Sequence, residues 1–308
     1  MERSVRAKRR NGLLALFCIL TAIAVPVPAQ NPPAAVAEAP IVIGTSHRLD
    51  SAILGDTREI NVWLPPEHGE GDARFPVLYL LDGALDQDFQ HMAGLAQLGS
   101  LSWTFGPVIV VGVQTRQRRA ELTPPPADPR YRAAFPEAGG AERFRRFIAE
   151  EVIPFVEARY RAGPRRGLIG ESLAGLFVVD TFLERPDLFH DYVAVSPSLW
   201  WDDRADMRRA AERLARRSYG GRRLYLAVAN EGGTMQDGVD RLRAALAERP
   251  PEGLEFRYAD RSASETHATI YHGAALDALR WLYARPPLDY GPTPWFMIEG
   301  ASPPAETP

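Results

Sequence analysis

Residues 170–175 read Gly-Glu-Ser-Leu-Ala-Gly, and a serine in this setting can act as a nucleophile. An apolar run at 167–169 precedes the motif and an apolar helical pattern at 176–179 follows it, so the order is strand, sharp turn, helix. That order is the setting of a nucleophile elbow, in which a strained turn exposes the serine hydroxyl at the top of a sheet. The usual pattern is Gly-x-Ser-x-Gly, and Ala174 replaces its second glycine. Ser172 is therefore a candidate nucleophile, and a serine in a structural turn is the alternative.

A histidine base must accompany such a serine, because an alcohol is a poor nucleophile at neutral pH. In enzymes with this elbow the chain order is serine, acid, histidine. Two of the six histidines, His267 and His272, follow the last predicted strand. His267 lies in a loop, whereas His272 is five residues further on and already within the next helical pattern. We therefore expect His267 to be the base, and a structural surface histidine is the alternative.

A carboxylate is needed to orient the base, and Glu231 is the preferred candidate. It follows the apolar run 224–229 directly, at the carboxyl end of a predicted strand. Functional groups of open α/β sheets gather at these strand ends. Asp237 and Asp260 remain alternative acids, and a solvated loop glutamate is the alternative reading of Glu231.

Two backbone N–H groups are predicted to form an oxyanion hole, which stabilises the charge of a tetrahedral intermediate. The first is the N–H of Leu173, directly after the candidate nucleophile. The second is the N–H of Ala84, in the turn after the apolar run 77–81. Gly83 permits the backbone turn that would direct this N–H inward. An ordinary Asp-Gly turn is the alternative.

Taken together, these stretches resemble the putative-esterase branch of the α/β-hydrolases, which includes enterochelin esterases, related siderophore-ester hydrolases, esterase D and the mycolyltransferases. The matching stretches cover most of residues 41–285 in the right order. They are YLLDGALDQDF (79–89), VIVVGVQTRQRRAELTPP (108–125), GESLAGLF (170–177), DYVAVSPSLWWD (191–202), LYLAVANE (224–231) and THATIYHGAALDALRWL (266–282).

The resemblance implies Ser172 as nucleophile, His267 as base and Glu231 as orienting acid, with oxyanion donors at Ala84 and Leu173. It implies a serine esterase that acts through an acyl-enzyme on siderophore esters or on aryl or glycan esters. Acyl transfer of the mycolyltransferase type and a non-catalytic binding module on the same fold are the alternatives. The elbow of this branch often reads Gly-x-Ser-x-Gly-Gly, from which the alanine at the fifth position departs, and alanine is the smallest replacement.

The elements that would position these residues alternate between strand and helix. The continuous apolar runs at 77–81 and 108–113 are typical of strands buried on both faces of a parallel sheet. This alternation predicts an α/β-hydrolase fold, with a mostly parallel sheet, helices on both faces and little or no lid domain. Segments 41–49 and 60–64 are expected to open the sheet as an antiparallel pair. Further buried strands are expected at 168–169, 192–195, 224–228 and 254–258.

The mouth of the site is expected to contain Trp200, Trp201 and Arg119. The two tryptophans would form a wall for an aromatic or glycan substrate, and packing within the fold is the alternative. Arg119 lies in the proline-rich loop 114–136, and loops of this length often have binding or lid roles. It would either meet an anionic substrate or pair with Glu121.

The N-terminal residues 1–29 have the pattern of a signal peptide, with a basic start, an apolar stretch at 13–25 and small residues before Gln30. A linker at 30–40, a catalytic domain at 41–285 and a proline-rich tail at 286–308 are expected to follow. The chain is thus predicted to be exported to the periplasm or secreted, without stable membrane insertion after cleavage. An uncleaved N-terminal anchor is the alternative.

Charge and cysteine usage restrict the partners. Residues 1–29 carry a net charge of +4 and the whole chain −3, which leaves −7 for the remainder. No basic stripe indicates nucleic-acid binding, so the expected partner is a small-molecule ester. The one cysteine lies within the predicted signal peptide, so the processed chain would have neither a disulfide nor a thiolate metal site. We expect no metal and no cofactor, since His267 and His272 lack a third ligand nearby.

Overall fold

The computed structural model describes residues 38–287 and 291–303. The chain divides into two units, Met1–Ile41 and Val42–Pro308, and we describe the second. The predicted signal peptide, 1–29, lies outside the described residues, as does most of the predicted linker.

Among the described residues, eight strands form one sheet in the order β1-β2-β4-β3-β5-β6-β7-β8. Their bounds are β1 Thr45–Ser51, β2 Asp56–Trp63, β3 Phe75–Leu81, β4 Ile109–Val113, β5 Ala162–Glu171, β6 Asp191–Val195, β7 Arg222–Val228 and β8 Leu254–Asp260. The β1–β2 and β2–β4 pairs are antiparallel, and the five pairs from β4–β3 to β7–β8 are parallel. The predicted fold class, a mostly parallel sheet opened by an antiparallel pair, is confirmed.

The central strands are apolar throughout because both of their faces are covered. In β3, Val77, Tyr79 and Leu81 point into one hydrophobic core. Leu78 and Leu80 point into the other core, as the two-residue period of a strand requires. All five side chains are buried. The continuous apolar run therefore reflects burial on two sides, which is typical of parallel sheets.

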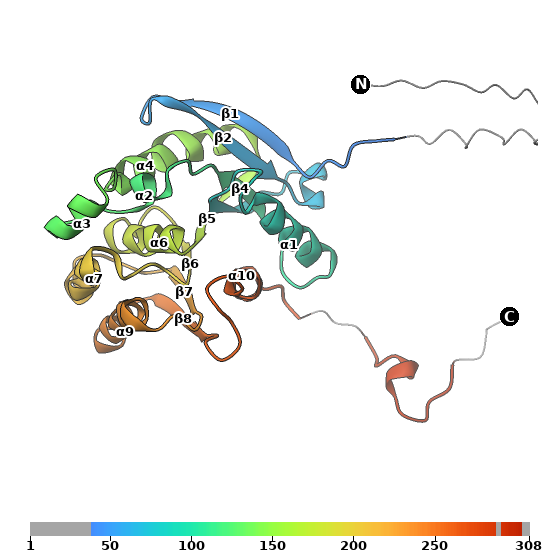
Figure 1. Cartoon of the computed structure of the whole chain (residues 1–308). Helices are drawn as coiled ribbons and strands as arrows, with labels where there is room; N and C mark the ends of the chain where they lie inside the picture. Colours follow the sequence, from blue (N-terminus) through green and yellow to red (C-terminus); the bar gives the residue numbers. More distant parts are fainter. Residues whose placement is uncertain (1–37, 288–290, 304–308) are drawn as a thin grey trace, which may run out of the picture. The chain divides into compact units, whose positions relative to one another are not determined.

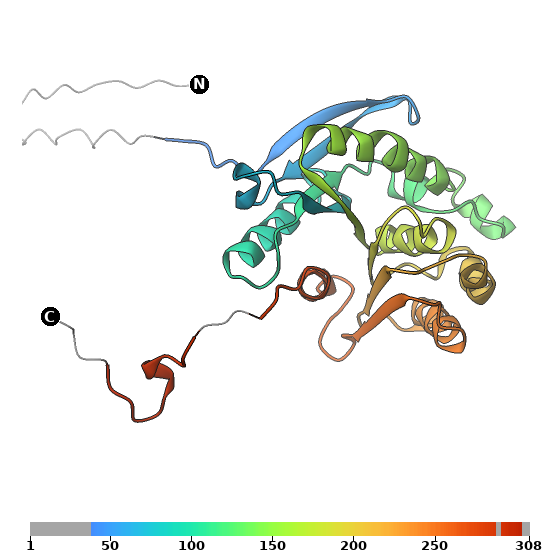
Figure 2. The ribbon, with the colours of Figure 1, turned by 180° about the vertical axis from the view of Figure 1, so that it is seen from behind.

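Helices lie on both faces of this sheet (Figures 1 and 2). Residues of α1 and α10 pack in one core, and residues of α4, α5, α6, α8 and α9 pack in the other. The bounds are α1 Phe89–Leu101, α2 Arg118–Leu122, α3 Pro129–Ala134, α4 Ala141–Phe147, α5 Ile153–Arg159, α6 Leu173–Glu184, α7 Trp201–Arg208, α8 Ala210–Ala215, α9 Gly233–Glu248 and α10 Ile270–Leu282. A π-helical segment, Ile148–Val152, joins α4 to α5 just before Pro154, which has no N–H for a regular helical bond.

Two details differ from the predicted elements. The strand expected at 254–258 exists as β8 but is not buried, since Phe256 is 37% exposed. The reason is topological, because β8 is the edge of the sheet and pairs only with β7. The loop 114–136 also contains two short helices, α2 and α3. Within the described part of the chain, we find no helix both long and apolar enough to span a membrane.

Candidate active site

Ser172 stands between β5 and α6 in the strained backbone conformation expected of an elbow, with φ 59° and ψ −117°. Its N–H donates to the Val195 carbonyl at the end of β6, over 3.0 Å. Its carbonyl accepts the Ser198 N–H at 2.9 Å and the Leu176 N–H at 2.9 Å. A positive φ is unfavourable for a residue with a side chain. The strained turn is therefore held by hydrogen bonds to the neighbouring strand end on one side and to α6 on the other.

The close approach of α6 explains why this turn contains Gly170 and tolerates Ala174. A Cβ on Gly170 would lie 2.7 Å from both the carbonyl carbon and the Cβ of Ala174. The glycine at 170 thus leaves the space into which the backbone and methyl group of Ala174 fit. Ala174 is fully buried there. The alanine that departs from the usual elbow pattern is a packed residue, and the strained geometry of Ser172 persists beside it.

The Ser172 hydroxyl lies beside a second hydroxyl, that of Ser198. Their Oγ atoms are 3.3 Å apart, and Ser198 is buried. In the described part of the chain, no hydrogen bond joins Ser172 Oγ to His267. The nucleophile candidate thus rests against the turn after β6, from which a side-chain rotation would have to release it.

His267 and Glu231 lie within hydrogen-bonding distance in the loops that follow β8 and β7. The His267 Nδ1 and Glu231 Oε1 atoms are 2.9 Å apart, and the Glu231 side chain is 7% exposed. The two loops are joined by the Asn230 N–H, which donates to the Glu265 carbonyl at 3.0 Å. An imidazole held at Nδ1 by a buried carboxylate keeps Nε2 available for proton transfer.

The alternative acids lie elsewhere. Asp237 is on α9 and pairs with Arg204 and Arg241, each at 2.9 Å. Asp260 accepts the Ser262 N–H at 3.0 Å. His272, the other histidine after the last strand, lies 3.2 Å from His91, measured between ring nitrogens. Of these candidates, the structure brings together only His267 and Glu231.

The predicted oxyanion donors differ in their present partners. Leu173 is the first residue of α6, so its N–H has no acceptor within the helix and points out of a helix N-terminus. The Ala84 N–H donates to Gln87 Oε1 at 3.0 Å, and Gln87 Nε2 donates to the Thr115 carbonyl at 2.8 Å. The Ala84 donor would therefore become available only after the Gln87 side chain releases it.

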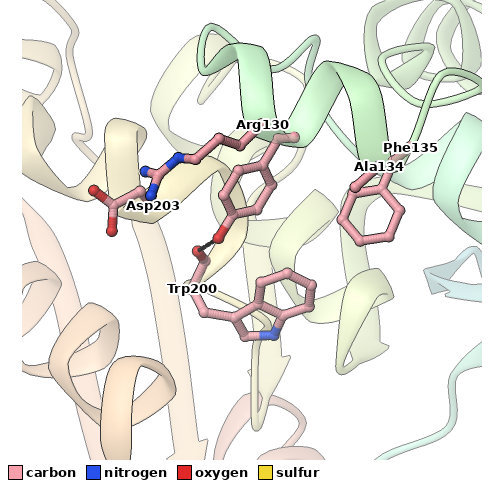
Figure 3. Close-up of a pocket in the computed structure, with 6 residues that line it drawn as sticks. Arg130, Ala134, Phe135, Trp200 and Asp203 are labelled. Carbon is pink, nitrogen blue, oxygen red and sulfur yellow. Dashed lines mark hydrogen bonds between the residues drawn. The ribbon is translucent and has the colours of Figure 1, made fainter.

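The two tryptophans have separate environments. Trp201 is buried, and its indole N–H donates to the Pro124 carbonyl at 3.0 Å. This contact favours the packing alternative for Trp201 and anchors the proline-rich loop. Trp200 is partly exposed and lines a pocket together with Tyr131 and Phe135 from the α3 segment (Figure 3). The Tyr131 hydroxyl donates to the Trp200 carbonyl at 3.3 Å.

Arg119 does not pair with Glu121. Arg58 occupies that carboxylate through two hydrogen bonds of 2.7 and 3.0 Å, and its guanidinium is buried. The predicted pairing of Arg119 with Glu121 is therefore wrong, because the buried Arg58 binds both oxygens of the Glu121 carboxylate. Arg119 lies 3.5 Å from Glu137 and stacks over the Phe135 ring, with 4.4 Å to the centroid. It lines a cavity of about 470 Å³ next to Leu173.

Three carboxyls at or near the elbow, Asp82, Asp88 and Glu171, are buried or partly buried. Burial raises the pKa of Glu171 to about 7, while the nearby His267 imidazole is the largest of the influences that lower it. Burial and the neighbouring Asp82 raise the pKa of Asp88 to about 6. Burial also raises the pKa of Asp82, and Arg118 opposes that increase. The His267 imidazole and the Glu231 carboxylate are thus both close enough to Glu171 to act on its charge. In the residues described, no group of three or more His, Cys, Asp or Glu side chains could hold a metal ion.

Comparison with known proteins decides the family. Residues 51–276 match the esterase family described as "Putative esterase". The chain belongs to this family. The match covers more than half of the chain and includes the elbow, the Glu231 loop and the His267 loop, so the family resemblance expected from the sequence is confirmed.

The relatives of the chain include proteins that are named as esterases, one of them as a siderophore esterase. The chain is 33% identical to the ferri-bacillibactin esterase BesA of Bacillus subtilis, over 52% of this chain and 60% of that protein. It is 32% identical to a siderophore enterobactin esterase of Emericella nidulans, over 55% of this chain and 62% of that protein. The matches thus span less than two thirds of these two relatives. An IroE-like serine hydrolase from Shewanella oneidensis superposes with a TM-score of 0.71 at 30% identity, over 78% of this chain and 80% of the other.

Sequence reasoning missed three residues at the site, Ser198, Gln87 and Arg118. Ser198 stands in the Ser-Pro-Ser-Leu-Trp-Trp stretch, of which only the two tryptophans were expected at the mouth of the site. Gln87 lies three residues after Ala84 and reaches back to it. Arg118 directly precedes Arg119, but its side chain bonds Asp82, whereas that of Arg119 lies beside Glu137. Chain order shows none of these contacts, because each depends on where a side chain turns.

The near-neutral pKa of Glu171 predicts a pH-dependent stability. A glutamate in the unfolded chain titrates near 4.3, so between about 4.5 and 7 the folded protein binds more protons than the unfolded one. The free energy of unfolding should therefore fall as pH rises through this interval. In Glu171→Gln the fall should be smaller, as measured by urea unfolding from pH 5 to pH 8.

The contrast variant is Glu150→Gln, because Arg146 lowers the pKa of that exposed carboxyl. Its removal should lower the free energy of unfolding by a nearly constant amount from pH 5 to pH 8, so the slope in this interval should match that of the parent. An identical slope for Glu171→Gln and the parent protein would contradict the burial of the Glu171 charge.

Proposed function

We propose that this chain hydrolyses carboxylic esters through an acyl-enzyme on Ser172, with His267 as general base and Glu231 as the acid that orients it. The observation that supports this most is the 2.9 Å contact between His267 Nδ1 and buried Glu231 Oε1, in a chain whose Ser172 has the strained elbow backbone. Membership in the esterase family supports the reaction class.

The proposed reaction has two halves, formation and hydrolysis of the acyl-enzyme. The Ser172 hydroxyl turns from Ser198 to His267, whose Nε2 takes its proton as Oγ attacks the ester carbonyl carbon. The tetrahedral intermediate collapses when the carbon–oxygen bond to the alcohol breaks, and His267 returns the proton to the departing alkoxide. Water, activated by the same imidazole, then attacks the acyl-enzyme and releases the acid and free Ser172. Glu231 stabilises the imidazolium in both halves of the reaction.

The oxyanion of both intermediates is proposed to accept hydrogen bonds from the N–H groups of Leu173 and Ala84. Leu173 has the advantage of the helix N-terminus, whose dipole favours negative charge. Ala84 takes part once Gln87 has been displaced from its N–H. The negatively charged oxygen of a tetrahedral intermediate is a stronger acceptor than the Gln87 amide oxygen, which favours this exchange.

Ser172→Ala should lower kcat for a short p-nitrophenyl ester by at least about 1,000-fold without changing the thermal unfolding midpoint. Glu231→Gln should cost less than His267→Ala, because the imidazole remains in place. The measurement is steady-state hydrolysis, with added sugar alcohols to detect acyl transfer. Retained turnover in Ser172→Ala would contradict the assignment of Ser172 as the nucleophile. A larger loss in Asp237→Asn than in Glu231→Gln would mean that the acid is misassigned.

The substrate is proposed to carry an aromatic ring, as in the esters of aryl siderophores. The pocket of about 380 Å³ in Figure 3 is lined mainly by the rings of Trp200, Tyr131 and Phe135. Trp200 is two residues from Ser198, whose hydroxyl touches that of Ser172. The siderophore substrates named for the relatives point in the same direction.

Trp200→Ala should raise KM for an aromatic ester by about tenfold and leave KM for an acetyl ester with the same leaving group unchanged. A ring contact is worth about 0.5–1.5 kcal/mol, and 1.4 kcal/mol corresponds to a factor of ten. Trp295→Ala, which removes an exposed tryptophan near the C-terminus, is the control. Equal effects on the aromatic and acetyl esters would argue against a ring-binding pocket.

We further propose that the hydrolase acts after export, as the pattern of residues 1–29 indicates. N-terminal sequencing of the protein purified from the periplasm or culture medium of a bacterial host should begin at Gln30. Replacement of Ala29 by phenylalanine should block this processing, because the cleavage site needs small residues. Recovery of the parent chain with an intact N-terminus from the cytoplasm would refute export.

A further inference from the structure

The strand β8, at the end of the sheet in Figure 1, has one open edge. Among the described residues it pairs with β7 alone, in an unbroken parallel register without proline or bulge. Glu255, Phe256 and Arg257, in the middle of β8, are exposed. Proteins usually protect an edge strand with proline, a bulge or a covering segment, because its free N–H and C=O groups can pair with another chain. The edge of β8 has none of these protections.

The free backbone groups of this edge belong to Leu254, Phe256 and Tyr258. The Gly253 carbonyl accepts the Gly221 N–H at 3.0 Å, and the Arg261 N–H donates to the Val228 carbonyl at 2.9 Å. The odd-numbered residues of β8 therefore direct their backbone groups toward β7. Successive residues of a strand alternate in direction, so the even-numbered residues direct theirs away from the sheet.

The exposed side chains on either side of Phe256 carry opposite charges. Glu255 and Arg257 are two residues apart, so both lie on the same face of the sheet. In the part of the chain that the structure describes, neither forms an ion pair, and the Arg257 guanidinium lies 5.1 Å from the centroid of the Trp281 ring. The stretch Glu-Phe-Arg is self-complementary, because an antiparallel copy of it places an arginine opposite the glutamate and a glutamate opposite the arginine.

The other face of β8 is apolar and continues onto α9. Leu254, Phe256 and Tyr258 line a cavity of about 340 Å³ there, and the Arg243 guanidinium lies 3.8 Å from the centroid of the Tyr258 ring. Phe256 is nevertheless 37% exposed at the open edge. A second β8, related by a two-fold axis perpendicular to the sheet, would bring its own apolar row to this same face. The two Phe256 rings would then cover each other.

Charge selects one register for such a pair. Outward-directed residues must oppose outward-directed residues, so near the middle of β8 the axis can pass only at Glu255, Phe256 or Arg257. An axis at Glu255 or at Arg257 places two like charges directly opposite each other, which is destabilising. An axis at Phe256 instead places Glu255 opposite the partner's Arg257, and does so twice. In this register Phe256 exchanges both backbone hydrogen bonds with the partner's Phe256.

We propose that β8 is the surface through which two copies of this chain associate, as antiparallel strands about a two-fold axis at Phe256. The partner is a second copy because the same three residues supply both the charges and the ring that the edge needs. The interface is isologous and uses up the free edge of each copy, so the assembly closes as a dimer. It contains none of the proposed catalytic residues, and the inference therefore does not rest on the proposed function.

Charge reversal tests the ion pairs. Sedimentation equilibrium over about 0.1–100 μM should show a monomer–dimer equilibrium for the parent protein. Glu255→Arg and Arg257→Glu should each raise the Kd of the dimer by about tenfold or more, because two attractions become two repulsions. The double variant Glu255→Arg/Arg257→Glu should return the Kd to within about threefold of the parent value, since opposite charges again face each other.

Glu150→Arg is the matched control for these variants. It also reverses the charge of an exposed glutamate, with a side chain 52% exposed, but on the π-helical segment between α4 and α5. Its Kd should equal that of the parent. Circular dichroism of each variant should match the parent spectrum, so that a weaker dimer reports on the interface and not on unfolding.

Disulfide formation tests the register. In a Cys18→Ser background, a cysteine introduced into β8 is the only thiol of the chain. Phe256→Cys should form a covalent dimer on mild oxidation, because a hydrogen-bonded antiparallel pair has its Cα atoms about 5.5 Å apart, a separation that a disulfide spans. A mixture of Glu255→Cys and Arg257→Cys should also form one, since these positions oppose each other. Neither of the two should do so alone, because each lies about 8 Å from its own copy.

Several results would overturn the inference. A parent protein that is monomeric over the whole concentration range would do so, as would an unchanged Kd in Glu255→Arg. A double variant that dimerises no better than the single variants would refute the ion pairs. Covalent dimers of Arg257→Cys alone, without any from Phe256→Cys, would refute the axis at Phe256. Assemblies larger than a dimer would contradict a closed pairing through one edge.

Discussion

A serine at φ 59° and ψ −117° persists because the backbone on both sides of it is bonded. Its N–H donates to the Val195 carbonyl, and its carbonyl accepts the Ser198 N–H. A strained residue of this kind costs about 1–3 kcal/mol, and each hydrogen bond contributes about 0.5–1.5 kcal/mol. The two contacts to β6 and the turn after it are thus of the size needed to offset the strain. The elbow consequently depends on the β5–β6 register, and every other part of the site is placed relative to it.

The parallel sheet then brings the remaining groups to one edge. Because β3 and β5 are hydrogen-bonded neighbours, the turn with Ala84 and the turn with Leu173 leave the sheet side by side. Glu231 leaves β7, two strands from β5, and His267 follows the edge strand β8. The loops after β7 and β8 bring Glu231 and His267 together, and the Asn230 N–H joins these loops by donating to the Glu265 carbonyl. Strand ends therefore position Ser172 and the turn with Ala84, whereas two loops that bond each other position Glu231 and His267.

The parts of this arrangement that follow from chain order could be predicted from the sequence. Apolar runs and their spacing predict the parallel sheet, and the order serine, acid, histidine points to Ser172, Glu231 and His267. Side-chain direction could not be predicted, which is why the contact of Trp201 with Pro124 and those of Arg119 with Glu137 and Phe135 were not foreseen. The exposure of β8 could not be predicted from the sequence either, because an edge strand and a central strand can share the same apolar composition.

Arg118 joins the turn after β3 to the end of β5, since its side chain donates to Asp82 Oδ2 and to the Glu171 carbonyl. Three carboxyls, Asp82, Asp88 and Glu171, lie in a half-buried region where desolvation favours their neutral forms. A lysine here would face a desolvation cost of its own and could lose its proton, whereas a guanidinium stays charged in any accessible pH range. Its fixed fork also allows one side chain to bond the Asp82 carboxylate and the Glu171 carbonyl together. The same group thus bonds both turns and opposes the rise in the pKa of the buried Asp82 carboxyl.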